Sequence, residues 1–185
     1  MNIEQTKLKD CYIILPKVFN DNRGYFYESY SKKSFEDAGF YYDFVQDNHS
    51  YSKNKNTIRG LHFQTNLFAQ AKLVRCTKGA IYDVAVDLRK DSLTYKQYIA
   101  VLLSSDNYKQ LLIPRGFAHG FLSLTNDVEI QYKADNYYSP ENDSGIIYSD
   151  PEINVGWKGL GLTSNPILSE KDSKRLVLKK TKVDF

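Results

Sequence analysis

The chain has 185 residues, of which 42% are hydrophobic and 25% charged, as in an ordinary globular protein with one sizeable core. The net charge of +3 is too small to indicate nucleic-acid binding, and no apolar run is long enough to cross a membrane. Residues 1–9 contain no apolar signal segment, and Cys11 and Cys76 show neither a pairing pattern nor metal-ligand spacing. We therefore expect one cytoplasmic domain over residues 1–185, with both cysteines as small buried residues and no nucleic-acid or membrane partner.

The N-terminal third is rich in aromatic residues, which favour strands. Ser31 can cap a helix that runs to Ala38, where Gly39 ends it. Strands are predicted over residues 11–15, 25–30 and 40–46, with a turn at 20–24 and polar loops at 47–50 and 52–56.

The middle of the chain alternates short apolar runs with Gly, Asn and Asp. Lys78-Gly79 is a hairpin signal between two of these runs, and Pro114-Arg115-Gly116 breaks the chain before another. Strands are predicted over residues 58–64, 72–76, 80–88, 98–103, 110–113, 117–124 and 129–132. Many short strands indicate an all-β sandwich or barrel, with a small helix and an irregular part from Tyr138 onward.

The strand Ile58–Gln64 carries the strongest chemical signal. Leu61 and Phe63 alternate with His62 and Gln64, so the polar pair should face the side opposite the two apolar residues. Arg59 lies beside an expected turn at Gly60. If the polar face lines the inside of a barrel, His62 is a candidate general base near neutral pH.

A metal site is the first alternative for histidines in a barrel. A metal cage usually needs a second ligand two residues along the strand, but that position is Gln64, a poor ligand. His119 lies on an apolar strand after Arg115, and His49 lies in a polar stretch. Only three histidines occur, which favours acid–base chemistry without a metal. From these residues alone, Tyr132 stands out little, and Tyr138 could belong to a core or stack on a base.

Ordered motifs extend from about residue 12 to 172. They are Arg23-Gly24-Tyr25-Phe26, Phe44-Val45-Gln46-Asp47-Asn48, Arg59-Gly60-Leu61-His62-Phe63-Gln64, Lys72-Leu73-Val74-Arg75, residues 83–89, residues 113–121, Tyr132-Lys133, Tyr137-Tyr138, Asp150-Pro151 and Leu168-Ser169-Glu170-Lys171-Asp172. In this order they resemble the dTDP-4-dehydrorhamnose 3,5-epimerases of the cupin superfamily.

The resemblance implies a jelly-roll barrel, a homodimer, no metal or cofactor, and a nucleotide-linked 4-keto-6-deoxy sugar as substrate. It implies that His62 removes a proton made acidic by the 4-ketone, while Asp172 orients and charges the imidazole. Lys72 would stabilise the enolate, helped by His119 and Arg59, and Tyr132 would protonate the opposite face.

The same resemblance implies a set of substrate-binding residues. Arg59 and Arg23 would hold the diphosphate, with Arg23 and Glu28 supplied by the partner subunit. The other implied contacts come from Gln46, Asn48, His119, Tyr138, Asp143 and Lys171.

Three departures from the family pattern leave the substrate open. Residues 68–72 read Phe-Ala-Gln-Ala-Lys instead of a Pro-Gln-Gly-Lys run, Asp143 replaces a Glu, and the loop 50–57 is about one residue longer. Alternatives are another nucleotide or a longer sugar, such as a GDP-linked heptose, and inversion at one carbon only. A 3,4-ketoisomerase and a non-catalytic sugar-nucleotide-binding cupin are further alternatives.

Overall fold

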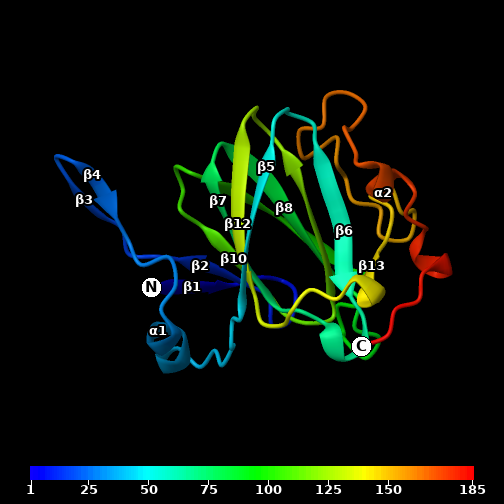
Figure 1. Cartoon of the computed structure of the whole chain (residues 1–185), viewed down its shortest axis with the longest axis horizontal. Helices are drawn as coiled ribbons and strands as arrows, with labels where there is room; N and C mark the ends of the chain where they lie inside the picture. The colour runs from blue at the N-terminus through cyan, green and yellow to red at the C-terminus, as the bar shows by residue number, and fades with distance from the viewer.

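The structure, a computed structural model, describes residues 1–185 and consists mainly of two facing antiparallel sheets (Figure 1). The first sheet has the order β1 (Asn2–Gln5), β2 (Tyr12–Leu15), β10 (Gln110–Ile113), β7 (Lys72–Lys78), β12 (Val128–Ala134) and β5 (Gln46–Ser52). The second has the order β13 (Asp143–Gly145), β6 (Ile58–Gln64), β11 (Phe117–Ser123), β8 (Ala80–Asp87) and β9 (Tyr98–Ser104).

The remaining elements are short. They are the ribbon β3 (Phe19–Asp21) and β4 (Gly24–Phe26), the helices α1 (Lys32–Asp37) and α2 (Glu170–Ser173), and 3₁₀ turns at Asn66–Phe68, Pro140–Asn142 and Leu178–Lys180. Ser31 caps α1 by accepting a hydrogen bond from the Ser34 N–H, as predicted. The jelly-roll barrel with a short N-terminal helix and an irregular C-terminal part is confirmed. No helix is long and apolar enough to cross a lipid bilayer.

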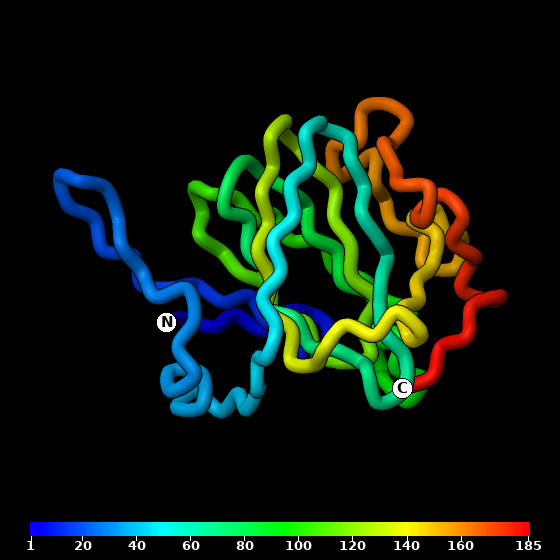
Figure 2. Tube along the Cα trace, in the orientation of Figure 1, coloured from blue at the N-terminus to red at the C-terminus, as the bar shows by residue number.

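Three apolar clusters hold the sheets and their covers together. The cluster between the sheets includes Val74, Ile81 and Phe121, and also the buried free thiols of Cys11 and Cys76, as expected. The C-terminal segment packs on the outer face of the second sheet, and the N-terminal segment with α1 packs on that of the first. Figure 2 shows both segments, with the red C-terminal end alongside β6.

Leu61 and Phe63 belong to the outer cluster beneath the C-terminal segment, which also includes Trp157. The alternation predicted for β6 is therefore correct at these positions, because His62 faces the barrel interior between them. The sequence could show the alternation but not which face would be covered by residues almost a hundred positions later.

The hairpin predicted at Lys78-Gly79 is wrong. Strand β7 belongs to the first sheet and β8 to the second, so the chain crosses between sheets at this point. Gly79 has φ +76°, and a Cβ there would lie 2.4 Å from Thr125 Oγ1. A tight glycine turn can connect two strands of one sheet or two strands of different sheets, so the local sequence did not distinguish a hairpin from a crossing between sheets.

The N-terminal strand predictions also need correction. Strand β4 ends at Phe26 instead of continuing to residue 30, and residues 40–45 are irregular. Their aromatic side chains pack beside α1, and their backbone forms no strand. The polar stretch 47–50, predicted as a loop, lies within edge strand β5, where one face meets solvent and the other continues toward a polar cavity.

Candidate active site

Strand β6 is irregular where it passes Gly60. His62 pairs with His119 of β11, whereas Arg59 pairs with Phe121, so three steps on β6 match two steps on β11. This bulge allows Arg59 and His62 to line one cavity, although strict alternation would separate them. The turn expected at Gly60 is therefore wrong, because this glycine lies inside a continuous strand.

Position 60 requires glycine for two reasons, its backbone conformation and the close approach of its neighbours. Its φ of +125° is rarely adopted by other residues, and a Cβ there would lie 2.6 Å from the Gly120 Cα. The close approach of the two glycines brings β6 and β11 together at the irregularity, so the bulge that positions His62 depends on both.

His62 is paired with Asp172, which comes from α2 in the C-terminal segment. The His62 Nε2 to Asp172 Oδ1 distance is 2.5 Å, and Asp172 Oδ2 accepts a weak 3.5 Å bond from the Gly60 N–H. Ser169 Oγ caps the helix by accepting from the Asp172 N–H. The carboxylate therefore fixes the imidazole through Nε2 and leaves Nδ1 as the basic nitrogen.

Burial and pairing shift the pKa values of this pair in useful directions. Burial lowers the pKa of His62, and the hydrogen bond and charge of Asp172 offset only part of that effect. Burial alone would raise the pKa of Asp172, but its hydrogen bond and charge interaction with His62 outweigh it and lower the pKa. At neutral pH the arrangement is a neutral imidazole oriented by a carboxylate, which suits a general base.

Lys72 on β7 and Tyr132 on β12 face this pair from the opposite sheet. Burial lowers the pKa of Lys72 to about 8, and burial raises that of Tyr132. The Lys72 Nζ lies 5.7 Å from the centre of the Tyr132 ring. The shared cavity of about 250 Å³ is lined by Ser50, Arg59, His62, Lys72, His119, Gly120, Phe121, Tyr132, Ser169, Lys171 and Asp172.

A second histidine–carboxylate pair lies at the inner wall. His119 Nε2 is 2.7 Å from Oδ1 of Asp83, a fully buried residue on β8. The sequence interpretation missed Asp83 as a functional candidate. The available signal was an acid on the same strand face as the apolar residues Ile81 and Ala85, because a carboxylate buried on such a face needs a partner.

Further charged residues surround the cavity. Arg59 is held by Ser52 Oγ, which accepts from Nε at 3.0 Å, and by the Tyr51 carbonyl, which accepts from Nη2 at 2.7 Å. Asp143 on β13 forms ion pairs with Lys171 and Arg175 at the two ends of α2. Arg175, like Asp83, was not among the predicted site residues.

A polar row on β5 runs from Ser50 toward Tyr138, but Gln46, Asn48 and Tyr138 do not themselves line the interior cavity. Gln46 donates to Asn48 Oδ1 at 2.9 Å and accepts from the Tyr138 N–H at 3.0 Å. Both residues share the strand face of Ser50, which lines the cavity. Tyr138 is half exposed, so its ring is accessible at the end of this row.

Gln64 does not line the cavity, contrary to expectation. Its side chain is buried and bonds to the carbonyls of Phe68 and Tyr137 and to the Ser139 N–H. It fixes the loops below the barrel, because an amide offers both donor and acceptor groups to them.

Arg23 and Glu28 are not brought to the cavity of their own chain. Arg23 lies on the turn of the β3–β4 ribbon, which projects away from the barrel (Figure 1), and pairs only with neighbouring Asp21. Glu28 is exposed at the root of the ribbon.

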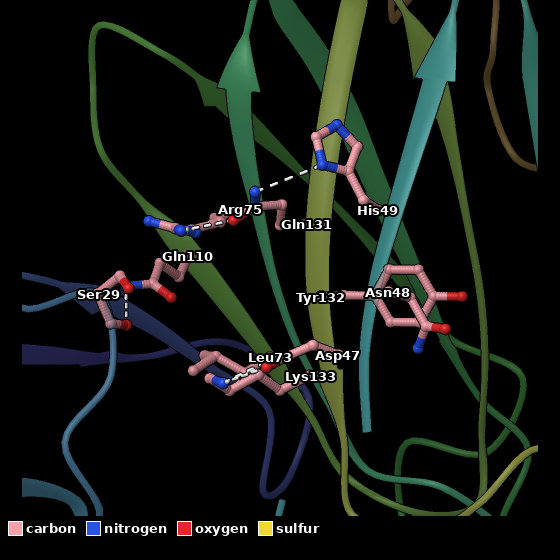
Figure 3. Close-up of a pocket in the computed structure, with 10 residues that line it drawn as sticks. All are labelled: Ser29, Asp47, Asn48, His49, Leu73, Arg75, Gln110, Gln131, Tyr132 and Lys133. Atoms are coloured by element: carbon pink, nitrogen blue, oxygen red, sulfur yellow. Dashed lines mark hydrogen bonds and ion pairs between the residues drawn. The ribbon is translucent and has the colours of Figure 1, made fainter. Parts of the chain in front are cut away.

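A second cavity, of about 270 Å³, lies on the outer face of the first sheet (Figure 3). Its polar groups bond to one another: Arg75 donates to Gln131 at 2.5 Å, and Gln131 lies 3.4 Å from His49 Nδ1. The acid near this histidine, Glu129, is one-third exposed, unlike Asp172. The interior cavity is therefore the better candidate for proton transfer.

No group of three or more His, Cys, Asp or Glu residues is arranged to hold a metal ion. What the interior cavity does hold is a paired imidazole on one sheet and a phenol and an ammonium group on the other. The fold and site define a jelly-roll barrel with the groups needed for acid–base chemistry.

Comparison with known proteins identifies the family. Residues 5–180 match the family model for dTDP-4-dehydrorhamnose 3,5-epimerase. The chain is 51% identical over 179 residues to the enzyme of that name from Escherichia coli K12, covering 96% of this chain and 95% of the relative.

Solved structures agree with this result. The Bacillus anthracis dTDP-4-dehydrorhamnose 3,5-epimerase with TDP and PPi bound superposes with a TM-score of 0.91 at 50% identity, covering 96% of this chain and 99% of that one. The Legionella pneumophila dTDP-6-deoxy-D-glucose-3,5-epimerase in complex with dTDP-4-keto-L-rhamnose gives 0.93 at 39% identity, covering 100% and 98%. The chain belongs to the dTDP-4-dehydrorhamnose 3,5-epimerase family and is an isomerase with the cupin-type barrel.

Proposed function

We propose that this chain converts dTDP-4-dehydro-6-deoxyglucose to dTDP-4-dehydrorhamnose by inverting C3 and C5. The observation that carries the proposal is that His62 on one sheet, paired with Asp172 of α2, shares a cavity with Tyr132 on the other sheet. Inversion needs a base and an acid on opposite faces of the carbon, and the two walls of the barrel supply them. The epimerase relatives favour this reaction over a 3,4-ketoisomerase or a silent binding protein.

The steps follow from which groups in the cavity can accept or donate a proton. His62 Nδ1 removes the proton next to the 4-ketone, and the electron pair moves into the carbonyl to give an enolate. Lys72 donates a hydrogen bond to its oxygen, while His119, held through Nε2 by Asp83, lines the same cavity. Tyr132 then delivers its phenolic proton to the opposite face, and both groups exchange protons with solvent before the second centre reacts.

The 4-ketone of the substrate makes these protons acidic, so the chemistry needs no redox step. General acid–base groups contribute about 10²–10⁴-fold each. We infer that no metal takes part, which the half-buried Lys72 supports because its ammonium can stabilise the enolate oxygen.

We also propose that the enzyme is a homodimer whose ribbons cross to the partner. The ribbon exposes Phe19, Tyr25 and Phe26 by 52–67%, which is unfavourable for an isolated chain. Arg23 at its turn would then meet the diphosphate beside the partner's cavity, with Glu28 near the sugar or nucleotide. Each chain is inferred to be one domain, since the N- and C-terminal segments cover the two outer faces of the same barrel.

Proton NMR in D₂O tests the reaction. With dTDP-4-dehydro-6-deoxyglucose, both the C3 and C5 proton signals should disappear, and His62→Ala should abolish exchange while the fold remains intact. Tyr132→Phe should block inversion while His62 still exchanges some protons. Wild-type exchange in the His62 variant would disprove its role as base, and loss of one signal would make the enzyme a single-centre epimerase. A panel that includes heptose-linked and GDP-linked ketosugars identifies any other preferred donor.

Subunit mixing tests the crossed ribbons. His62→Ala and Arg23→Ala should each be inactive alone, but their heterodimer should regain one complete site with a wild-type base and a wild-type partner arginine. No recovery after verified heterodimer formation would place Arg23 in the site of its own chain.

A further inference from the structure

We propose that Arg175 is a positioning residue for the His62–Asp172 pair, acting through Asp143 to hold α2 against strand β13. The inference rests on the proposed function, because it takes His62 as the base. Arg175 does not line the cavity, so it acts on the pair and not on the substrate.

The helix that carries Asp172 needs an external anchor. Helix α2 has only four residues, Glu170–Ser173, which is too short to be stable by itself. Asp143 Oδ2 receives Lys171 from the first turn of α2 and Arg175 Nη2, at 3.0 Å, from just after its end. Both ends of the helix are therefore tied to one carboxylate on β13.

Strand β13 places this anchor two positions along from Gly145, the residue that pairs with the base. Gly145 pairs with His62, and Asp143 pairs with Gln64 two positions along β6. The Arg175 side chain is 14% exposed, and its guanidinium packs over Gly145, where a Cβ would lie 3.1 Å from Nε and 3.3 Å from Cζ. Because Gly145 has no side chain, the Arg175 guanidinium can pack directly over the residue that pairs with His62.

The backbone reinforces the same connection. The Leu176 carbonyl, one residue beyond Arg175, accepts a hydrogen bond from the Ile147 N–H, and Ile146 exchanges bonds with Leu61 next to His62. Burial alone would raise the pKa of Asp143, but Lys171 and Arg175 outweigh it and lower the pKa. The carboxylate therefore stays ionised over the pH range in which the base works.

Arg175 also contributes charge. Its positive field lowers the pKa of His62, together with burial and Lys72 and against the effect of Asp172. The charged and titratable groups around His62 on each neighbouring element are Arg59 on β6, Lys72 on β7, His119 on β11, Tyr132 on β12, Asp143 on β13, and Lys171 and Asp172 on α2. Removing Arg175 deletes one cation from this set and leaves the others in place.

The experiment compares Arg175→Met and Arg175→Lys with the control Lys174→Met. The control removes a neighbouring cation whose side chain is 72% exposed and pairs with Glu170 on the solvent side. For each variant we would measure unfolding, kcat, KM and the pH profile of kcat/KM. Arg175→Met should lower kcat by roughly 10- to 100-fold, the usual loss when a residue that orients an active group is removed, with KM nearly unchanged.

The pH profile separates positioning from a general loss of stability. The acid limb of kcat/KM should move to higher pH in Arg175→Met, because the imidazole loses a nearby positive charge and its pKa rises. Arg175→Lys keeps the cation and should show the wild-type limb with a kcat roughly three- to tenfold low. Lys174→Met should behave as wild type in all measurements.

Each outcome is decisive. A folded Arg175→Met with wild-type kcat and acid limb would overturn the inference, as would a change in KM alone, which would make Arg175 a substrate-binding group. If Arg175→Met does not fold, Arg175→Lys decides, and a wild-type kcat there refutes positioning. His62→Ala runs in the same assay: activity in that variant would refute the proposed function itself, whereas an inactive His62→Ala beside an unchanged Arg175→Met refutes only this inference.

Discussion

Replacing Asp172 with asparagine would test the central pair at almost constant side-chain volume. The carboxylate now accepts two hydrogen bonds, from His62 Nε2 at 2.5 Å and from the Gly60 N–H at 3.5 Å. An asparagine has one acceptor oxygen for these two donors. If its oxygen faces Gly60, its amide N–H₂ points at Nε2 and forces the proton onto Nδ1, the atom proposed to act as base.

The alternative orientation is also defective. With the amide oxygen toward His62, the N–H₂ group meets the Gly60 N–H, so two donors face each other at a buried site. Even then the negative charge that raises the basicity of His62 is absent. We expect kcat to fall by about 10²–10⁴-fold, which corresponds to about 3–5 kcal/mol of transition-state stabilisation.

The assay combines loss of the C3 and C5 proton signals in D₂O with a urea unfolding curve. Glu170→Gln is the matched control, because Glu170 lies on the same helix with its side chain 82% exposed and pairs only with Lys174. The control should keep wild-type kcat. A folded Asp172→Asn with kcat within about threefold of wild type would refute the assigned role of the carboxylate in basicity and tautomer choice.

Three further predictions concern the pH range, the arginine proposed to bind the diphosphate, and the bulge. Because the pKa of Lys72 is about 8, the ammonium form is lost as pH rises through about 8, and kcat/KM should decline over the same range. Lys72→Met should lose most activity, and its remaining activity should not show this decline. The same decline in Lys72→Met would assign the titration to another group. Ser52→Ala removes the acceptor of Arg59 Nε and should raise KM about 3- to 10-fold with little change in kcat, so a pure kcat effect in steady-state kinetics would contradict the contact. Gly60→Ala adds a Cβ 2.6 Å from the Gly120 Cα at a positive φ and should destabilise the fold by more than about 2 kcal/mol, and an unchanged urea midpoint would show that the bulge can relax.

Much of the fold could be predicted from local pattern. Alternation of Leu61 and Phe63 with His62 placed the histidine on the face opposite the two apolar residues, and Ser31 and Gly39 bounded the helix correctly. These features depend on neighbours a few residues apart, so the sequence contains the information needed to predict them.

Other features depend on partners distant in the chain. The turn at Gly79 reads as a hairpin, but the strands around it pair with β10, β12, β9 and β11 in different sheets. The polar residues 47–50 form a strand because β12 binds them and because one face of β5 continues toward a polar cavity. Local composition does not reveal either partner.

For the site, the sequence by itself determined the chemical groups and, through ordered motifs, the family in which they act. The tertiary structure decided how they combine: the bulge at Gly60 aligns Arg59 with His62, burial lowers the pKa of His62, and the hydrogen bond and charge interaction with His62 lower that of Asp172. It also revealed Asp83 paired with His119, and Arg175, more than 100 residues after His62, paired with Asp143. Hydrogen bonding and burial arise from three-dimensional neighbours, and so these residues became recognisable only once the barrel had brought them together.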